Sequence, residues 1–501
     1  MQAYRTLEQR FARISDVEGA LGILNWDNDT IMPAGAASQR AGQVATLSVI
    51  AHELITAPDM PDMLQDAAAG ADADGGLNAW QHANLGEMRR LHAHAAAVPA
   101  DLVDAASRAN SACERAWREA RARSDFRGLL PLLSEVLLRQ REVAQAKGDA
   151  LSLAPYDALL DLYDPGNRMA LIDPVFADLR AGLPALLGEA LEYQAGQPAV
   201  LPLDGPFPVE RQFALAGRLM RALGFDSERG RLDTSTHPFC GGATDDVRIT
   251  TRYEAADFAG SLMGVLHETG HALYEQGRPR EWLAQPVGRA RGMTMHESQS
   301  LLIEMQACRS RAFAGFLAPL LREAFGTDGP AWQADNLHRR LTRVSPGCIR
   351  VDADEVTYPA HVLVRTRLET ALIGGELALA DLPEAFNAGI RELLGITVPD
   401  DRRGCLQDIH WPAGLWGYFP TYTLGAITAA QLFDAACRAQ PDIVPGLARG
   451  DFAPLLSWLR MHVHERGSSV GDAVIVASAT GAPLSASIYQ RHLRRRYLAA
   501  A

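Results

Sequence analysis

Apolar side chains recur every three or four residues along most of the chain, a spacing that predicts α-helices. The segments 102–146 and 211–223 are clear examples, and both contain few runs of β-branched residues. Short stretches with Gly or Pro interrupt the pattern near residues 70–76, 163–166 and 196–198. None of them is long enough to be an interdomain linker. The pattern therefore predicts a mainly α-helical protein with a single domain that spans residues 1–501.

One segment has a different pattern. Asp246–Tyr253 alternates apolar and polar side chains and is rich in β-branched residues, which predicts a β-strand. It lies directly before a helical segment at 255–276. If this strand lies at the edge of a sheet, it can pair with an extended peptide through main-chain hydrogen bonds. The alternative is a strand that only packs against the helix.

Composition and charge exclude several classes of protein. The 501 residues include 48 basic and 60 acidic side chains, a net charge of −12, which argues against nucleic acid as the main partner. No apolar run is long enough to span a bilayer, and the first residues do not resemble a signal peptide, so we expect a cytoplasmic protein without membrane partners. The six cysteines are scattered, as expected for reduced thiols rather than disulfides.

A metal-binding motif stands inside the helical segment 255–276. In His267-Glu-Thr-Gly-His271 the two histidines are four residues apart, so both imidazoles project from one helix face and can reach one ion. Glu268 lies about 100° further around the helix, beside such an ion rather than bound to it. There it can accept a proton from a water molecule that the ion has acidified. The alternative is a solvent-exposed face that happens to carry two histidines and a glutamate.

A hydrolytic zinc site needs three protein ligands and one open position. The segment Met293–Ser300 opens another helical stretch, and Glu297 within it is the expected third ligand. Glu304 and His296 are rival ligands. Thr294 and Glu297 also have the spacing of a capping box, in which the glutamate would bond to the start of its own helix instead.

These residues resemble the signatures of the carboxypeptidase Taq family of metallocarboxypeptidases, and the resemblance covers nearly the whole chain. Five signatures occur in the family's order: Asp246–Thr250, His267–His271, His296–Gln299, Ile349–Asp354 and Gly404–Trp411. None of the five departs from the family pattern in a way that would disable the site.

The resemblance implies an elongated helical homodimer with a deep central groove and a small β-sheet beside the metal-binding helix. It implies a metal-dependent carboxypeptidase that removes C-terminal residues from peptides one at a time, with broad tolerance of side chains. His267, His271 and Glu297 would hold one divalent ion per subunit. We expect Zn²⁺, and the family also accepts Co²⁺ or Mn²⁺.

Attack on a peptide carbonyl builds negative charge on its oxygen, which nearby hydrogen-bond donors must stabilise. The resemblance points to His410 and one tyrosine for this role. We expect Tyr422, and Tyr418 is the alternative. Gln407 and Asp408 could orient His410 or could be purely structural.

An exopeptidase must also recognise the free C-terminal carboxylate, which an arginine can bind through two parallel hydrogen bonds. Arg350 is the expected residue because it belongs to a family signature with little other evident chemistry. Alternatively, it forms an ion pair with Asp352, Asp354 or Glu355. Arg248 is the second candidate, although its place in the predicted strand is equally compatible with lining the groove.

Two other functions compete with this interpretation. An oligoendopeptidase or a dipeptidyl carboxypeptidase would use the same metal helix and would differ only in where the carboxylate is bound. A binding protein with a structural metal is a different class. Structural zinc sites normally have four protein ligands, so three ligands with an adjacent glutamate favour catalysis.

Overall fold

The computed structural model describes residues 2–71 and 76–498. The predicted mainly helical fold with one small sheet is confirmed. The helices before the sheet are α1 (Gln2–Thr30), α2 (Ala37–Ile55), α3 (Met60–Ala69), α4 (Ala79–Ala96), α5 (Ala100–Arg123), α6 (Phe126–Leu151), α7 (Pro155–Tyr163), α8 (Met169–Ala195) and α9 (Val209–Leu223).

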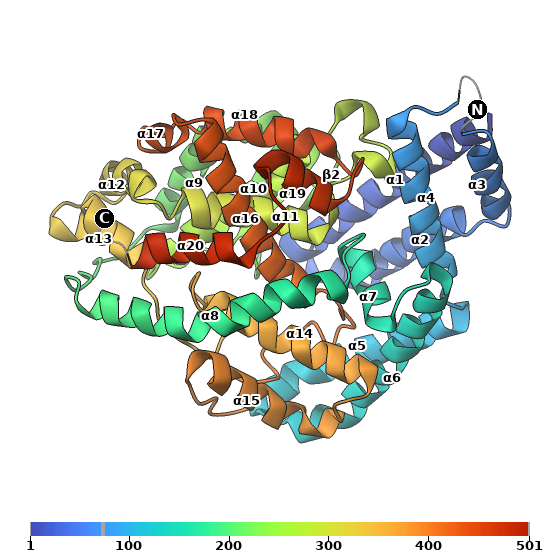
Figure 1. Cartoon of the computed structure of the whole chain (residues 1–501), viewed down its shortest axis with the longest axis horizontal. Coiled ribbons are helices and arrows are strands. Elements are labelled where there is room, and N and C mark those ends of the chain that lie inside the picture. Colours follow the sequence, from blue (N-terminus) through green and yellow to red (C-terminus); the bar gives the residue numbers. More distant parts are fainter. Residues whose placement is uncertain (1, 72–75, 499–501) are drawn as a thin grey trace.

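The helices after the sheet form the second half of the fold. They are α10 (Phe258–Gln276), α11 (Gly292–Leu301), α12 (Arg311–Phe325), α13 (Ala334–Leu341), α14 (Tyr358–Gly374), α15 (Leu382–Leu394), α16 (Phe419–Ala439), α17 (Ile443–Leu447), α18 (Ala453–His462), α19 (Asp472–Thr480) and α20 (Ala486–Tyr497). Figure 1 shows α10, α11 and α16 in the middle of the molecule, with α1–α4 at one end and α12 and α13 at the other. No helix in the described part of the chain is long and apolar enough to cross a membrane.

The long periodic segment 102–146 forms two helices rather than one. Ser124 adopts a left-handed conformation (φ 55°) and ends α5. The side chain of Asp125 then accepts a hydrogen bond from the backbone N–H of Gly128 (2.8 Å), which caps the start of α6. Apolar periodicity continues across the break because α5 and α6 pack against each other.

The sheet has three strands in the order β1-β3-β2: β1 (Gly230–Thr234), β2 (Phe239–Ala243) and β3 (Asp246–Thr251). β3 is the predicted strand, and it ends two residues earlier than expected. It pairs in parallel with β1 and antiparallel with β2. The idea that this strand lies at an edge is therefore wrong, because both of its sides are already hydrogen-bonded. β2 is an edge strand instead.

Helix α10 begins and ends close to the predicted positions. Its N-cap is Asp257, whose carboxylate accepts hydrogen bonds from the backbone N–H groups of Ala259 (3.0 Å) and Gly260 (3.2 Å). It ends at Gly277, as the Gly and Pro signals predict. Most of its side chains are buried, since α10 packs against β3 on one side and against α9 and α11 on others.

Two glycines allow α11 to lie very close to its neighbours α10 and α16. A Cβ atom on Gly270 of α10 would come within 2.5 Å of the Gln299 carbonyl oxygen and 2.6 Å of the Ser300 Cα. On the other side, a Cβ on Gly425 of α16 would come within 2.8 Å of the side chain of Glu297. Real Cβ atoms do not make such short contacts, so the three-helix packing requires glycine at both positions.

The apolar interior forms one large cluster that runs from Ala109 to Tyr497, with α10, α11 and α16 inside it. A smaller cluster joins α1, α3 and α4. All six cysteines are free thiols, which confirms the expectation of no disulfides. The site helices are therefore held within the main core.

We predict that Gly270→Ala destabilises the protein. The new methyl group would press against the backbone of α11, and overpacking of this kind typically costs about 1–3 kcal/mol. The melting temperature should fall, as measured by circular dichroism.

The matched control is Gly264→Ala in the same helix, where the nearest atom to a new Cβ is 3.7 Å away. This variant should be neutral or stabilised by up to about 1 kcal/mol, because alanine favours helices over glycine. Equal destabilisation by the two variants would contradict the close approach at Gly270.

Candidate active site

A cavity of about 1000 Å³ opens beside α10, α11 and the start of α16. Its lining includes most of the predicted site residues: His267, Glu268, His271, Glu297, Arg350, Tyr418 and Tyr422. His410 is not part of the lining, but its Nε2 lies 3.1 Å from the hydroxyl of Tyr422. Sequence segments more than 150 residues apart thus meet around one space.

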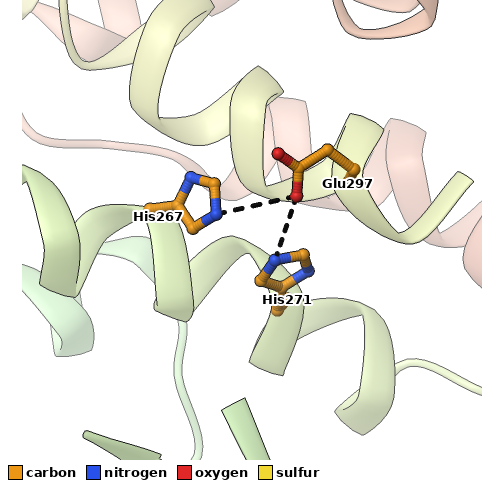
Figure 2. Close-up of side chains that lie close together, drawn as sticks. All are labelled: His267, His271 and Glu297. Carbon is orange, nitrogen blue, oxygen red and sulfur yellow. Dashed lines mark ion pairs between the residues drawn. The ribbon is translucent and has the colours of Figure 1, made fainter. Parts of the chain in front are cut away.

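The three expected metal ligands lie together. Figure 2 shows the two imidazoles projecting from α10 toward the carboxylate of Glu297 on α11. Glu297 Oε2 lies 3.7 Å from His267 Nε2 and 3.4 Å from His271 Nε2. One donor atom from each residue falls within 4.8 Å of the other two, close enough for a single ion.

The capping-box alternative for Glu297 is wrong. Helix α11 begins at Gly292, so Thr294 is inside the helix rather than at its N-cap. Its hydroxyl donates to Asp164 Oδ2 (2.6 Å) instead of to its own helix. The Glu297 side chain is therefore directed to the histidines.

The two rival ligands contact the far sides of the histidines. Glu304 Oε2 lies 3.0 Å from His267 Nδ1, the ring nitrogen that faces away from Glu297. His296 Nδ1 lies 2.6 Å from His271 Nδ1 in the same way. Partners at the second nitrogen of a ligand histidine fix its orientation and its tautomer. We therefore interpret Glu304 and His296 as residues that orient the ligands.

Each orienting residue is itself held by a charged neighbour. Arg309 Nη2 donates to Glu304 Oε1 (2.7 Å). On the other side, His296 Nε2 lies 2.9 Å from Glu275 Oε1, and Glu275 forms an ion pair with Arg278 (3.0 Å). The carboxylates that support the histidines are therefore paired in turn, as buried charges require.

The charges of the ligand set suit a cation. Burial opposes the charged form of Glu297, but His267 and His271 outweigh it and lower the pKa of Glu297 to about 2. Burial lowers the pKa of His271 to about 4, so its ring is neutral near pH 7. Burial also opposes the charge of His267, yet Glu297 and Glu304 raise its pKa to about 10. An ion at His267 Nε2 would take the place of a proton there.

Glu268 lines the cavity although only 7% of its surface is exposed. Burial raises its pKa to about 7, and the neighbouring His267 cation works in the opposite direction. A carboxylate with a pKa near neutrality can both accept and return a proton at physiological pH. The position and the pKa of Glu268 therefore suit a general base.

His410 and the two tyrosines form an aromatic group at one wall. Burial lowers the pKa of His410 to about 4, so its ring is neutral near pH 7. Burial raises the pKa of Tyr418 and of Tyr422 above the usual tyrosine value, so both keep their hydroxyl protons. Both tyrosines are therefore available as hydrogen-bond donors, and only Tyr422 contacts His410 by a hydrogen bond.

Arg350 is 7% exposed and lines the same cavity. Its Nε donates to Asp408 Oδ1 (3.0 Å), and its Nη1 donates to the hydroxyl of Tyr358 (3.2 Å). Its backbone N–H donates to Gln407 Oε1 (2.8 Å). The hydrogen bonds of Gln407 and Asp408 thus hold Arg350, not His410, and the ion pair of Arg350 is with Asp408 rather than with an acid of its own segment.

Arg248 occupies a different environment. Both ends of its guanidinium donate to Asp246 (2.9 and 2.7 Å), and its Cζ lies 4.2 Å from the ring centre of Trp26 in α1. It is not among the residues that line the cavity. The structure therefore places Arg350, and not Arg248, in the same cavity as the candidate metal ligands.

Sequence reasoning missed several residues of this site. Tyr358 and His237 line the cavity, and Arg365 shares Asp408 with Arg350 through a 2.6 Å ion pair. The only sequence signal for His237 is its place in the His-Pro-Phe segment 237–239. No local pattern marks Tyr358 or Arg365, because their roles depend on contacts with distant segments.

Comparison with known proteins identifies the family. The sequence profile of the carboxypeptidase Taq (M32) metallopeptidases matches residues 6–497. Thermostable carboxypeptidase 1 of Thermus thermophilus is 40% identical over 506 residues, covering 99% of this chain and 98% of that protein. Thermostable carboxypeptidase 1 of Pyrococcus furiosus is 33% identical and covers 98% and 97%.

Solved structures agree with the sequence comparison. Metallocarboxypeptidase 1 of Trypanosoma cruzi superposes with a TM-score of 0.97 at 40% identity, and the match covers 100% of both chains. An M32 carboxypeptidase from Deinococcus radiodurans gives a TM-score of 0.92 at 34% identity, over 99% of each chain. This chain is thus a peptide hydrolase that belongs to the carboxypeptidase Taq (M32) family of metallopeptidases.

Proposed function

We propose that this protein removes single residues from the C-terminus of peptides, with broad side-chain tolerance and with Glu268 as the general base. The observation that carries the proposal is that a possible metal-ligand set, Glu268 and Arg350 all line one cavity. A base beside a metal site supports hydrolysis. A buried cation in the same cavity supports recognition of a free carboxylate.

The donor set fits a catalytic divalent ion. Two imidazoles and one carboxylate are ligands that zinc accepts, and three protein ligands leave a coordination position open. We infer Zn²⁺ on this chemistry, with Co²⁺ or Mn²⁺ as alternatives. A divalent ion supplies Lewis acidity there: it acidifies water and polarises the peptide carbonyl.

Different residues of the chain then transfer the proton and stabilise the developing negative charge. Glu268 takes a proton from the attacking water and delivers it to the nitrogen of the leaving amino acid. Tyr422 donates a hydrogen bond to the carbonyl oxygen as negative charge develops on it. We propose Tyr422 rather than Tyr418 because His410 contacts its hydroxyl and can fix its direction.

Arg350 binds the C-terminal carboxylate in this proposal. Asp408 is shared between Arg350 and Arg365 (3.0 and 2.6 Å), so two guanidinium groups are matched by one carboxylate. One positive charge is left in excess at the cavity wall. Burial works against the charge of Arg350, but Asp408 outweighs it and keeps its pKa above the usual arginine value. The excess charge can be balanced by a substrate carboxylate.

The homodimer and the cytoplasmic location stay predictions. The dimer rests on the family resemblance, and the location rests on the sequence pattern. Analytical ultracentrifugation of the purified protein tests the dimer.

We predict that Glu268→Gln lowers kcat by about 10²–10⁴-fold, the usual contribution of a general base, because the amide cannot accept the proton. KM should change little, since Glu268 is not part of the carboxylate-binding wall. Activity is measured on a blocked dipeptide with a free C-terminus.

Metal content separates the base from the ligands. Glu268→Gln should retain the metal, whereas Glu297→Gln should lose it, as measured by inductively coupled plasma mass spectrometry. Near-normal activity of a metal-loaded Glu268→Gln enzyme would falsify the role of Glu268. Normal metal binding by Glu297→Gln would remove Glu297 from the ligand set.

We predict that Arg350→Ala is badly impaired on substrates with a free C-terminus. Loss of a desolvated bidentate contact costs about 2–5 kcal/mol, or roughly 30- to 5,000-fold in kcat/KM. The wild-type enzyme should barely cleave the matching C-terminal amide, and Arg350→Ala should lose this preference for acid over amide.

Two other arginines provide controls. Arg252→Ala removes a cation from the same cavity lining, and Arg248→Ala removes one outside it. Both should keep the preference for acid over amide. If Arg248→Ala loses the preference while Arg350→Ala keeps it, the carboxylate is bound beside β3. If the wild type cleaves both substrates equally, the oligoendopeptidase alternative is favoured.

A further inference from the structure

Glu369 of α14 is a carboxylate with no exposed surface. It accepts three hydrogen bonds: from the Tyr156 hydroxyl (2.7 Å), from the Trp411 indole N–H (2.9 Å) and from the backbone N–H of Gly417 (3.2 Å). Glu369 belongs to none of the family signatures in the sequence. It nevertheless connects α7 to the segment that leads into α16.

Keeping this carboxylate inside the core is costly. Burial raises the pKa of Glu369 to about 7, even though its three donors act in the opposite direction. A buried carboxylate must give up its hydration, and an apolar side chain of similar size often stabilises a core as well or better. The presence of a glutamate here is therefore better explained by what it holds in place.

The segment that Glu369 holds is 411–417, and it is fixed at both ends. Oε1 accepts from Trp411 and Oε2 accepts from Gly417, so one carboxylate sets the distance between the two residues. Gly417 has a φ of +87°, and a Cβ there would come within 2.8 Å of the Leu160 backbone nitrogen. The segment thus passes against α7 with no space to shift toward it.

The two groups that the proposed function uses at the oxyanion, Tyr422 as the donor and His410 as its orienting contact, lie on opposite sides of this segment. His410 immediately precedes Trp411, and Tyr418 immediately follows Gly417. Tyr422 lies in the first turn of α16, which starts at Phe419. The contact between His410 Nε2 and the Tyr422 hydroxyl (3.1 Å) spans the two ends of the held segment. A change in the end-to-end distance of 411–417 would therefore change that contact.

We propose that Glu369 is a positioning residue for catalysis: by holding both ends of the segment 411–417, it sets His410 and Tyr422 in place to stabilise the oxyanion. Glu369 does not line the cavity, so it acts only through these bonds. The inference rests on the proposed peptidase function and extends it to a residue outside the cavity.

The test is steady-state kinetics of Glu369→Gln. The amide has the size of the carboxylate and keeps one acceptor oxygen, but its NH₂ group cannot accept from the second N–H. A misplacement of catalytic groups by about 1 Å can cost about 10²-fold, so we expect kcat to fall roughly 10- to 100-fold. KM and metal content should change much less than kcat, because the hydrogen bonds of Arg350 go to Asp408 and Tyr358 and the candidate metal ligands lie on α10 and α11, all outside this segment.

An inhibitor pair distinguishes positioning from general weakening of the fold. A phosphonate peptide that mimics the tetrahedral transition state should bind Glu369→Gln more weakly by the same factor as the loss in kcat/KM. A product-like inhibitor with a free carboxylate should bind as it does to the wild type. A purely structural role of Glu369 would not separate the two inhibitors.

Two further variants distinguish a loss of positioning from a failure of Glu369→Gln to fold. Trp411→Phe removes one donor of the held segment and should reproduce the fall in kcat. Tyr156→Phe removes the donor that lies outside the segment and should leave kcat nearly unchanged. Wild-type kcat in Glu369→Gln and Trp411→Phe, with only a lower melting temperature, would overturn the inference. If the wild type itself cleaves no peptide, the proposed function fails first.

Discussion

The close packing of α11 between α10 and α16 is the constraint on which the site depends. Glycine at positions 270 and 425 lets the three helices approach to distances that a single methyl group would prevent. The approach brings Glu297 of α11 to within 3.7 Å of two histidines on α10. Gly270 lies directly beside His271 in the sequence, so the same turn of α10 supplies both a candidate metal ligand and the space for α11. The packing of the three helices and the position of Glu297 beside the histidines therefore depend on the same contact.

Around this contact, buried polar and charged side chains form short series of hydrogen bonds and ion pairs. Each candidate ligand histidine is supported by a series that ends in an arginine: His267–Glu304–Arg309 on one side and His271–His296–Glu275–Arg278 on the other. Such pairing is needed because an unmatched charge in the interior would be far too costly. At Arg350, by contrast, two arginines share one carboxylate. The positive charge that this sharing leaves in excess lies where the substrate carboxylate is proposed to bind.

The sequence predicted those features whose causes are local. The two histidines four residues apart lie within one helical segment and the stop at Gly277 directly follows it, so α10 and its motif could be predicted from the sequence. The central place of β3 within the sheet could not be predicted, because strand order depends on pairing with residues from two other segments. A capping box at Thr294 was equally plausible locally. It is excluded because α11 begins at Gly292 and because the Thr294 hydroxyl donates to the distant Asp164.

Long-range partners also explain what the motifs could not assign. Spacing alone placed Glu304 and His296 among the possible ligands, since it cannot distinguish a ligand from the residue that orients one. Asp408 was linked to His410 by proximity in sequence, whereas its bonds go to Arg350 and Arg365. Glu369 carries no motif at all. Its three partners come from segments more than 40 residues away, and only the fold brings them together.

The most direct test of the central claim is the series of products that the metal-loaded enzyme releases from one unstructured peptide, followed by mass spectrometry over time. Removal of C-terminal residues one at a time predicts a ladder of products, each one residue shorter than the last and all with the original N-terminus. The metal-stripped enzyme should produce none. Internal fragments, or a ladder with steps of two residues, would contradict a carboxypeptidase of this kind.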